Sequence, residues 1–308
     1  MNRPNFLIIG AGKSGTTALY EYLAQHPQVF MSKVKETNFF ELEGHEKLSG
    51  YDASDPEGYF HYPWSVTDRK EYFDLFKDAK PNQAIGEASP MYLYGKKAVH
   101  RIREELPDVK IIVVLRDPVD RLYSRYYHLV REGREPSPEF ADALQKGNIW
   151  WKKNDLVQEG FYYTHLKKWY DNFPAAQIKV MLYDDLRKDP KAFVSDVYQF
   201  IGVDPNFSPD LDVEYNQSGR IKNKFKDRLI GQNGIIKRTV NTVFPGLVQW
   251  MKNNKKIRAK YIEMQASNLE KPKLEKALRL QMINEIYKYE IENLQALIGR
   301  DLRKWMGA

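Results

Sequence analysis

One stretch near the start of the chain, FLIIGAGKSGTTALYEYLAQ at residues 6–25, constrains the fold more than any other. It begins with a short apolar run, continues through a glycine-rich turn that carries Lys13, and enters a helical pattern at Thr16 or Thr17. A strand, a glycine turn and a helix in this order aim backbone N–H groups and a helix N-terminus at one point, where phosphate binds readily. The stretch therefore predicts a phosphate site, although an ordinary strand-to-helix connection has a similar composition.

Further short apolar runs follow in the first 183 residues, and helical patterns separate them. The runs are continuous, and VKIIVVL is rich in β-branched residues, as expected for strands buried on both faces of a parallel sheet. The alternation predicts an α/β fold, a three-layer α/β/α sandwich with a central parallel sheet. The expected strands span residues 6–9, 28–31, 83–85, 109–115 and 178–182. The expected helices span residues 16–25, 68–76, 96–106, 117–131, 160–173, 189–201 and 272–298.

Three regions do not follow this alternation. Residues 41–66 are polar and aromatic, residues 134–154 contain two prolines and a Trp pair, and residues 232–271 are basic. Loops this long in a compact domain are usually functional. No internal repeat divides the chain, so residues 1–308 are predicted to form a single domain with a variable basic insertion at 232–271 and a C-terminal helix at 272–298.

The charge balance and the absence of cysteine restrict the class of protein. The chain has 48 basic and 41 acidic residues, a net charge of +7 and a pI near 9.1, which favours an anionic ligand or surface. It has no cysteine, which excludes disulfides and zinc sites with cysteine ligands. No apolar run approaches the ~20 residues that span a bilayer, and the first strand begins too early for a signal peptide. We therefore expect a soluble protein of the cytoplasm.

Polar residues follow four of the expected strands at the point where each strand ends. The first strand leads into residues 13–17 (KSGTT), the second into 32–36 (SKVKE), the third into 87–90 (EASP) and the fourth into 116–118 (RDP). Because the carboxyl ends of parallel strands share one edge of a sheet, where ligands bind in such folds, these groups are expected to lie together. Four unrelated turns would not be expected to collect Lys, Glu and Arg there.

A nucleotide kinase is one function for such an edge, but the first motif does not fit it. The pattern G-x-x-x-x-G-K-[ST] requires its first glycine at position 7, which is Leu7, so the loop is too short to cradle several phosphates. The fourth strand also ends on Arg116, where an aspartate that holds magnesium would be expected; Asp184 and Asp185 offer a substitute. A kinase remains the second hypothesis.

A sulfuryl donor removes this mismatch. The nucleotide 3′-phosphoadenosine 5′-phosphosulfate (PAPS) carries single 5′- and 3′-phosphates, so it needs a smaller cradle, a second anion site and no metal. Arg116, at a strand end, and Ser124, two helical turns later, could form that second site. Alternatively, Arg116 forms only a surface ion pair with Asp117 or Asp120.

At this point the sequence resembles the sulfotransferase family, and most closely the heparan sulfate glucosaminyl sulfotransferase branch and its bacterial relatives. The motifs that carry the resemblance are IIGAGKSGTTALYEYLAQHP, KETNFF, GEASPMYL, VVLRDPVDRLYSRYYH, GFYYTHLKKW, LYDDLRKDP and YNQSGR, in that order, followed by the closing helix EIENLQALIGRDLRKW. The resemblance implies the P-loop-like sulfotransferase fold and transfer of the sulfuryl group from PAPS to a hydroxyl of a carbohydrate-type acceptor, with no metal.

The resemblance also implies roles for single residues. Lys13 would neutralise the departing phosphate oxygen. Glu36 would be the general base, although it could instead be a solvated loop carboxylate paired with Lys33 or Lys35. The residues implied to bind the nucleotide are Lys13, Ser14, Gly15, Thr16, Thr17, Arg116, Ser124, Tyr162, Ser218, Gly219 and Arg220. The residues implied to face the acceptor are Glu36, Phe40, Glu87, Ala88, Ser89 and His165.

Some of these implied roles have simple alternatives. Packing of an amphipathic helix against the sheet is the better explanation for Trp169, and for His165 it is as good an explanation as the implied role. The heparan branch carries Lys where this chain has Ala88, which puts a heparan-type substrate in question. The aromatic residues of 41–66 and 134–154, Tyr62 and Trp150 among them, would suit stacking on sugar rings. The basic insertion could bind nucleic acid or a membrane surface, or form a solvated face or the rim of an anionic-substrate site; nucleic acid is not an expected partner.

Overall fold

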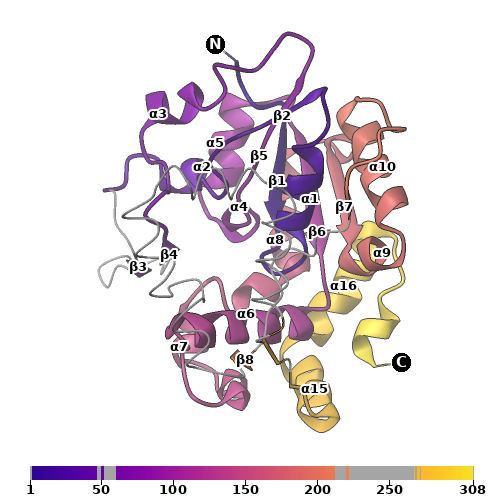
Figure 1. The fold of residues 1–308 in the computed structure, drawn as a ribbon. Helices are drawn as coiled ribbons and strands as arrows, with labels where there is room; N and C mark the ends of the chain where they lie inside the picture. The colour runs from indigo at the N-terminus through magenta and orange to yellow at the C-terminus, as the bar shows by residue number, and fades with distance from the viewer. Residues whose placement is uncertain are drawn as a thin grey trace.

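A computed structural model describes residues 2–46, 50–51, 60–211, 220–221, 267, 269–270 and 272–307 of the chain. Five strands form a central parallel sheet in the order β2-β5-β1-β6-β7 (Figure 1). They are β1 (Phe6–Gly10), β2 (Val29–Met31), β5 (Ala84–Ala88), β6 (Lys110–Leu115) and β7 (Ile178–Leu182). The predicted strands and the parallel sheet are confirmed. The order reverses beside β1, which makes the carboxyl edge there a favourable place for a ligand.

Apolar side chains cover both faces of the sheet, as the continuous apolar runs predict. Along β1, Leu7 and Ile9 enter one core cluster, whereas Phe6 and Ile8 enter the other. Helices α1 (Thr16–Leu23) and α10 (Pro190–Ile201) pack on the second cluster. Helices α5 (Ala98–Glu105), α8 (Tyr162–Asn172) and α16 (Lys288–Ile298) pack on the first. The chain is therefore a three-layer α/β/α sandwich.

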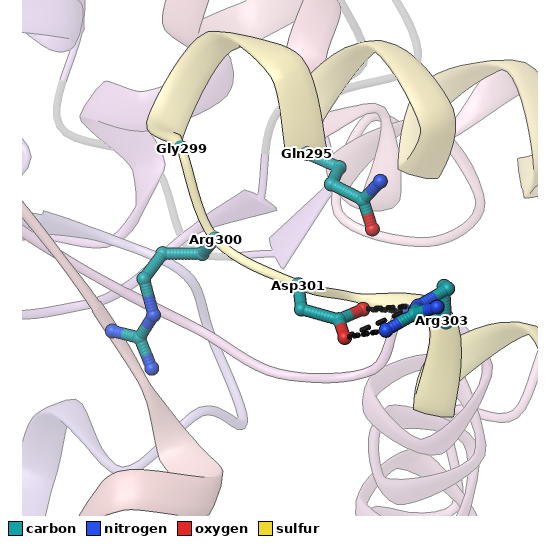
Figure 2. A pocket seen from close by; sticks show the side chains of 5 residues that line it. All are labelled: Gln295, Gly299, Arg300, Asp301 and Arg303. Atoms are coloured by element: carbon teal, nitrogen blue, oxygen red, sulfur yellow. Dashed lines mark hydrogen bonds and ion pairs between the residues drawn. The ribbon is translucent and has the colours of Figure 1, made fainter.

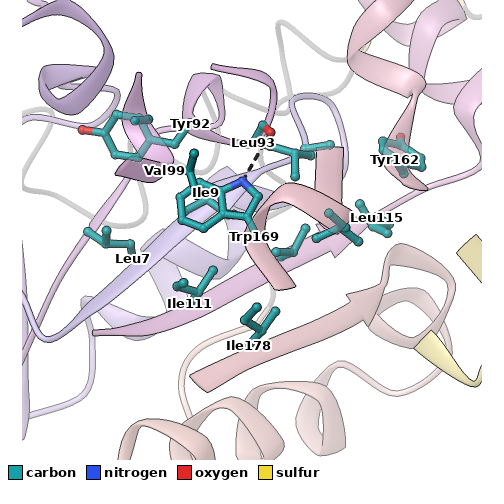
Figure 3. Packing of buried hydrophobic residues seen from close by; sticks show 14 of the residues in the cluster. Leu7, Ile9, Tyr92, Leu93, Val99, Ile111, Leu115, Tyr162, Trp169 and Ile178 are labelled. Carbon is teal, nitrogen blue, oxygen red and sulfur yellow. Dashed lines mark hydrogen bonds between the residues drawn. The ribbon is translucent and has the colours of Figure 1, made fainter. Parts of the chain in front are cut away.

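Trp169 of α8 lies at the centre of the first core cluster (Figure 3). Its side chain is 1% exposed, and its indole N–H donates to the Leu93 carbonyl at 3.4 Å. Ile9 and Ile111 from neighbouring strands pack in the same cluster. The packing role expected for this tryptophan is confirmed.

Local capping signals set the helix that follows β6. Helix α6 spans Pro118–Glu132, and the Asp117 side chain accepts from the Asp120 N–H at 2.9 Å. Proline at the first helical position lacks the N–H that would have no partner there, and Gly133 ends the helix in the left-handed region at φ 67°. The prediction of this helix from Asp117-Pro118 is confirmed. Helix α3 (Arg69–Asp74) has a similar aspartate cap, because the Asp68 side chain accepts from the Glu71 N–H.

The closing helix is not the single uniform element that the sequence predicted. It consists of α15 (Lys276–Met282), one π-helical stretch η4 (Ile283–Tyr287) and α16. The 3-10 turn η5 (Arg303–Met306) then brings Trp305 into the core. The inserted residue of a π-helix turns the apolar face, so the two halves present different sides to α6 and α8.

Several short elements were not predicted, because each is too brief to show a period. They are α2 (Phe39–Leu42), α4 (Met91–Tyr94), α7 (Ile149–Lys152), α9 (Tyr183–Lys188), η1 (Phe140–Leu144), η2 (Gln158–Gly160), η3 (Ala175–Gln177), β3 (Gly50–Tyr51), β4 (Phe60–His61), β8 (Arg220–Ile221) and β9 (Leu269–Glu270). Strands β3 and β4 pair antiparallel, as do β8 and β9. Within the described residues, no helix is both long enough and apolar enough to cross a membrane.

Candidate active site

Backbone contacts bring the predicted groups to one edge of the sheet. The Ser89 N–H donates to the Ile8 carbonyl at 3.0 Å, and the Glu36 N–H donates to the Ala88 carbonyl at 2.9 Å. The Arg116 side chain donates to the Lys13 carbonyl at 3.3 Å. The residues that follow β1, β2, β5 and β6 are thus directly connected, as the parallel order predicts.

The loop after β1 has the properties of an anion cradle. Gly15 precedes α1 in the left-handed region at φ 94°, and the first turn of α1 contains no acidic residue. The Ser14 side chain is fully buried, and its Oγ has no hydrogen-bond partner within the described part of the chain. A buried hydroxyl without a partner is unfavourable unless a ligand supplies one. Ser14, with Thr16 and Thr17 at the helix N-terminus, therefore suits a phosphate.

Lys13 occupies this loop among other cations. Burial, together with the charges of Arg125, Arg131 and Arg116, lowers the pKa of Lys13 to about 7, and the Glu36 charge opposes this shift. Among the charges that shift this pKa, one carboxylate, that of Glu36, stands against three guanidinium groups. A bound phosphate would add negative charge there and would favour the protonated lysine.

Glu36 lies beside Lys13 with the opposite electrostatic bias. Burial alone would raise the pKa of Glu36, but the charges of Lys35, Arg125 and Lys13 outweigh it and hold that pKa below its usual range. Lys35 forms an ion pair with Glu36, and Lys33 pairs instead with Asp78 at 3.1 Å. The Glu36 backbone adopts the left-handed region at φ 62°, a strained conformation for glutamate that often marks a functional position. An ionised carboxylate in this position can accept a proton.

Arg116 is only weakly paired with the aspartates that the sequence offered it. Its nearest distance to the Asp120 carboxylate is 3.9 Å. Asp117 and Asp120 are bound instead by Arg279 of α15. The guanidinium lies over the Tyr183 ring, 5.0 Å from its centroid, which leaves its planar fork available to a phosphate. Ser124 lies on α6, which begins two residues after Arg116, and is 3% exposed.

The third strand and the segment beside it are placed differently from the expectation. Glu87, Ala88 and Ser89 are all 0% exposed, and Phe40 is 1% exposed. Glu87 accepts hydrogen bonds from four hydroxyls, and Ala88 lies in the core cluster beneath α1. In this conformation the four side chains are buried behind Glu36 and support the segment that carries it. Their predicted acceptor contacts stay predictions.

The Tyr and His of the GFYYTHLKKW motif also lie inside the protein. Tyr162 is 1% exposed, and its hydroxyl has no hydrogen-bond partner within the described residues. Burial lowers the pKa of His165 to about 4, and its Nε2 lies 2.8 Å from the Gln158 carbonyl. A neutral, buried imidazole fits the packing alternative better than an acceptor contact. The predicted nucleotide role of Tyr162 stays a prediction.

Comparisons with known proteins show the family to which this chain belongs. The sequence model of the sulfotransferase domain family matches residues 3–228. The chain belongs to the sulfotransferase family. A crystal structure of a sulfotransferase from Alicyclobacillus acidocaldarius has a TM-score of 0.68 and 28% identity over 99% of both chains.

Two curated relatives of this sulfotransferase are larger proteins. Bifunctional heparan sulfate N-deacetylase/N-sulfotransferase 4 of Mus musculus is 28% identical over 221 residues, which are 67% of this chain and 23% of that protein. Protein 3 of the same name from Homo sapiens is 28% identical over 214 residues, again 67% of this chain and 23% of the relative. The chain thus spans about a quarter of the curated relatives that it matches.

Some predicted residues of the sulfotransferase lie outside the described part of the chain. Ser218 and Gly219 are among them, as is nearly all of the basic insertion at 232–271. Arg220 begins β8 and pairs with Glu270 of β9 through the backbone. Their predicted roles stay predictions.

The structure also shows site residues that the motifs did not single out. Arg125 of α6 forms a buried ion pair with Asp155 and contributes its charge to both Lys13 and Glu36. Arg121, one turn earlier, pairs with Glu159 at 2.7 Å. The spacing of Arg121, Arg125 and His128 puts them on one face of α6, and this periodicity was a signal that could have found them.

A separate pocket lies where α16 ends (Figure 2). Gln295, Gly299, Arg300, Asp301 and Arg303 line it. Arg303 pairs with Asp301 at 2.6 Å, and Arg300 pairs with Asp185 at 2.9 Å. Asp185, a possible magnesium ligand of a kinase, is thus engaged at this surface. Among the described residues, no group of three or more His, Asp and Glu could hold a metal ion.

Proposed function

We propose that this sulfotransferase transfers the sulfuryl group of PAPS to a hydroxyl of a carbohydrate-type acceptor. One observation carries the proposal: a buried lysine whose pKa is lowered to about 7 lies in a glycine loop, beside a carboxylate whose pKa is also lowered. The pair provides a lysine that an incoming anion would keep protonated and a carboxylate base that is already ionised. Both are needed for attack of a hydroxyl on a sulfuryl group.

The described residues fit the two ends of the donor. The hydroxyl of Ser14, buried and without a partner, and the N-terminus of α1 would hold the 5′-phosphate. Arg116, two residues before α6, and Ser124, in the second turn of α6, would hold the 3′-phosphate. The contact between Arg116 and the Lys13 carbonyl, 3.3 Å, joins the two anion sites. Tyr162, Ser218, Gly219 and Arg220 complete the proposed nucleotide site.

In the proposed reaction Glu36 takes the proton of the acceptor hydroxyl while the hydroxyl oxygen forms a bond to sulfur. The bond between sulfur and the 5′-phosphate oxygen breaks on the opposite side. Lys13 neutralises the charge that develops on that departing oxygen, so 3′-phosphoadenosine 5′-phosphate (PAP) leaves. Each residue acts on charge that grows in the transition state, which is where stabilisation increases the rate.

The donor can be tested with PAP, which needs no acceptor. We expect PAP to bind without magnesium, and to bind more tightly than Mg·ATP in calorimetry. Because the lysine pKa is about 7 before binding, PAP binding at pH 8 should take up a proton. Titrations in buffers of different ionisation enthalpy measure this uptake, and Lys13→Met should abolish it. Preference for Mg·ATP would support the kinase hypothesis instead.

An aromatic pair beside Glu36 supports a sugar as the acceptor. The Tyr62 and Trp64 rings stack with centroids 4.8 Å apart and an interplanar angle of 16°, and Trp64 is 49% exposed. Their turn is attached next to the base, because the Val66 N–H donates to the Thr37 carbonyl at 2.8 Å. Tyr62 also hydrogen-bonds Arg125, whose charge acts on Glu36. An exposed indole face held there would suit a sugar ring.

The other tryptophan expected to stack on sugars is not available. Trp150 is 0% exposed, and its indole N–H donates to Ser137 at 2.9 Å. This difference provides a matched test with a glycan panel and labelled donor. Trp64→Ala should raise the acceptor KM about tenfold with little change in unfolding temperature, the scale of one lost aromatic contact. Trp150→Ala should lower the unfolding temperature instead, and an unchanged acceptor KM in the Trp64 variant would contradict the platform.

A further inference from the structure

Glu159 contacts the 5′-phosphate loop from a distant part of the chain. The Gly12 N–H donates to Glu159 Oε1 at 2.6 Å, across 147 positions of sequence. Glu159 is 3% exposed, and a Cβ on residue 12 would lie 2.8 Å from that oxygen. Only glycine permits this approach without displacing the carboxylate. The residue immediately before Lys13 is therefore fixed by a buried side chain.

The second oxygen of Glu159 is bound just as firmly. Arg121 Nη1 donates to Glu159 Oε2 at 2.7 Å, and the arginine is 0% exposed. Arg121 also donates to the carbonyls of Leu156 and Asp155. Burial tends to raise the pKa of Glu159, and the Arg121 charge opposes this. A carboxylate beside an anion site would repel the ligand, and the paired guanidinium reduces that repulsion.

These contacts link the loop to the helix that carries the second anion site. Arg121 and Ser124 both lie on α6, less than one turn apart. Glu159 therefore connects Gly12 of the 5′ loop to α6, and Arg116 holds the Lys13 carbonyl of the same loop. The separation of the two phosphate sites depends on both links.

We propose that Glu159 is a positioning residue of the 5′-phosphate loop. By accepting the Gly12 N–H, it turns that amide away from the ligand and sets the direction in which Lys13 and the amides after it face the 5′-phosphate. This inference rests on the proposed function, because it assumes that the loop receives a nucleotide 5′-phosphate. It assigns Glu159 no contact with the donor.

Two double variants separate the acceptor for Gly12 from the buried charges. Glu159→Gln with Arg121→Met removes both charges but keeps an oxygen that can accept the Gly12 N–H. Glu159→Leu with Arg121→Met removes both charges and that oxygen. Since each pair lacks a buried ion, neither suffers from an arginine left without its carboxylate. The two proteins differ in one side-chain amide at residue 159, which supplies the oxygen that can accept the Gly12 N–H.

The measurement compares PAP with adenosine 3′-monophosphate, which lacks the 5′-phosphate, by calorimetry. The Leu-containing double variant should bind PAP at least about tenfold more weakly than the Gln-containing one, the scale of one lost buried hydrogen bond. Both double variants should bind adenosine 3′-monophosphate within about twofold of each other, because this ligand uses only the α6 site. Equal loss for both nucleotides, or equal PAP affinity in both variants, would overturn the inference.

A second buried carboxylate provides the control. Glu290 is 6% exposed and accepts from the Thr164 N–H at 3.0 Å, so Glu290→Gln perturbs a similar bond at α8 instead of the loop. This variant should bind PAP as the unmodified protein does. If the unmodified protein itself binds no PAP, the proposed function fails. If it binds PAP and the two double variants bind PAP with equal affinity, the proposed function stands and only the role of Glu159 fails.

Discussion

Glu36 and Glu87 follow or end neighbouring strands at the same edge of the sheet, yet their surroundings differ in kind. Cations surround Glu36: Lys35 pairs with it, and Lys13 and Arg125 add their charges, so its pKa is lowered despite burial. Hydroxyls surround Glu87, and burial raises its pKa although all the nearby hydroxyls hydrogen-bond to it. The pKa values of two glutamates at one edge of the sheet are thus shifted in opposite directions.

Four hydroxyls, which we call the hydroxyl cage, surround the Glu87 carboxylate and indicate its structural role. Its oxygens accept from Thr37 at 2.7 Å, Ser89 at 2.9 Å, Tyr92 at 2.7 Å and Tyr72 at 3.1 Å. Thr37 is the residue after Glu36, so the cage holds the strained turn that carries Glu36, the proposed base. Cations keep a carboxylate ionised for chemistry, whereas neutral donors fix it as a structural centre.

The largest effect should come from removing the base. Glu36→Gln keeps the shape of the side chain but not its proton affinity, so turnover should fall about a thousandfold, within the usual range for general-base removal. PAP affinity should change less than about threefold, because the proposed base would face the acceptor and not the nucleotide. Labelled donor with a glycan panel measures turnover, and calorimetry measures PAP binding. Glu43→Gln, which disturbs only the surface pair with Arg69, is the control.

Normal turnover in the Glu36→Gln protein would end the comparison, since both glutamates would then be structural. A large loss of PAP affinity would contradict it in another way. It would show that the Glu36 carboxylate organises the 5′ loop instead of accepting a proton.

The sequence contained enough to predict the edge on which both glutamates lie. Continuous apolar runs indicated strands buried on both faces, and the residues after them indicated the site. The period of two also held information that was not used: Ile85 and Glu87 share one face of β5 and Ala88 takes the other, and a core cluster covers each face. This alternation explains why both side chains are buried, and their predicted acceptor contacts stay predictions.

Other parts of the site could not be read from local pattern. Tyr72 reaches Glu87 from another element, and Glu159 reaches Gly12 across 147 positions. Such contacts depend on how helices pack on the sheet, which a motif does not encode. The aromatic residues illustrate the same limit, since Trp64 is 49% exposed and Trp150 is 0% exposed although both lie in long aromatic excursions.

The second effect concerns the stability of the cage. Glu87→Leu leaves four buried hydroxyls without their acceptor, and we expect it to lower the free energy of unfolding by about 3 kcal/mol. Glu87→Gln keeps acceptor and donor atoms there and removes the buried charge, so its loss should be below about 1 kcal/mol. Urea unfolding measures both. Equal losses in the two variants would show that packing, not hydrogen bonding, holds this centre.

The smallest effect is a difference in sign with pH. The pKa of Glu36 is lowered by folding, so its contribution to stability is present above the unfolded value of 4.5 and is lost as the pH falls through the folded value. The pKa of Glu87 is raised, so its contribution is present below 4.5 and is lost as the pH rises through the folded value. Urea unfolding between about pH 2.5 and 8 should therefore show two opposite trends. As the pH rises towards 4.5, the Glu36→Gln protein should fall behind the unmodified protein, and above 4.5 the Glu87→Gln protein should gain on it. If the unfolding free energies of the two variants changed with pH in the same direction, the cations at Glu36 and the hydroxyls at Glu87 would shift the two pKa values alike. That result would contradict the comparison.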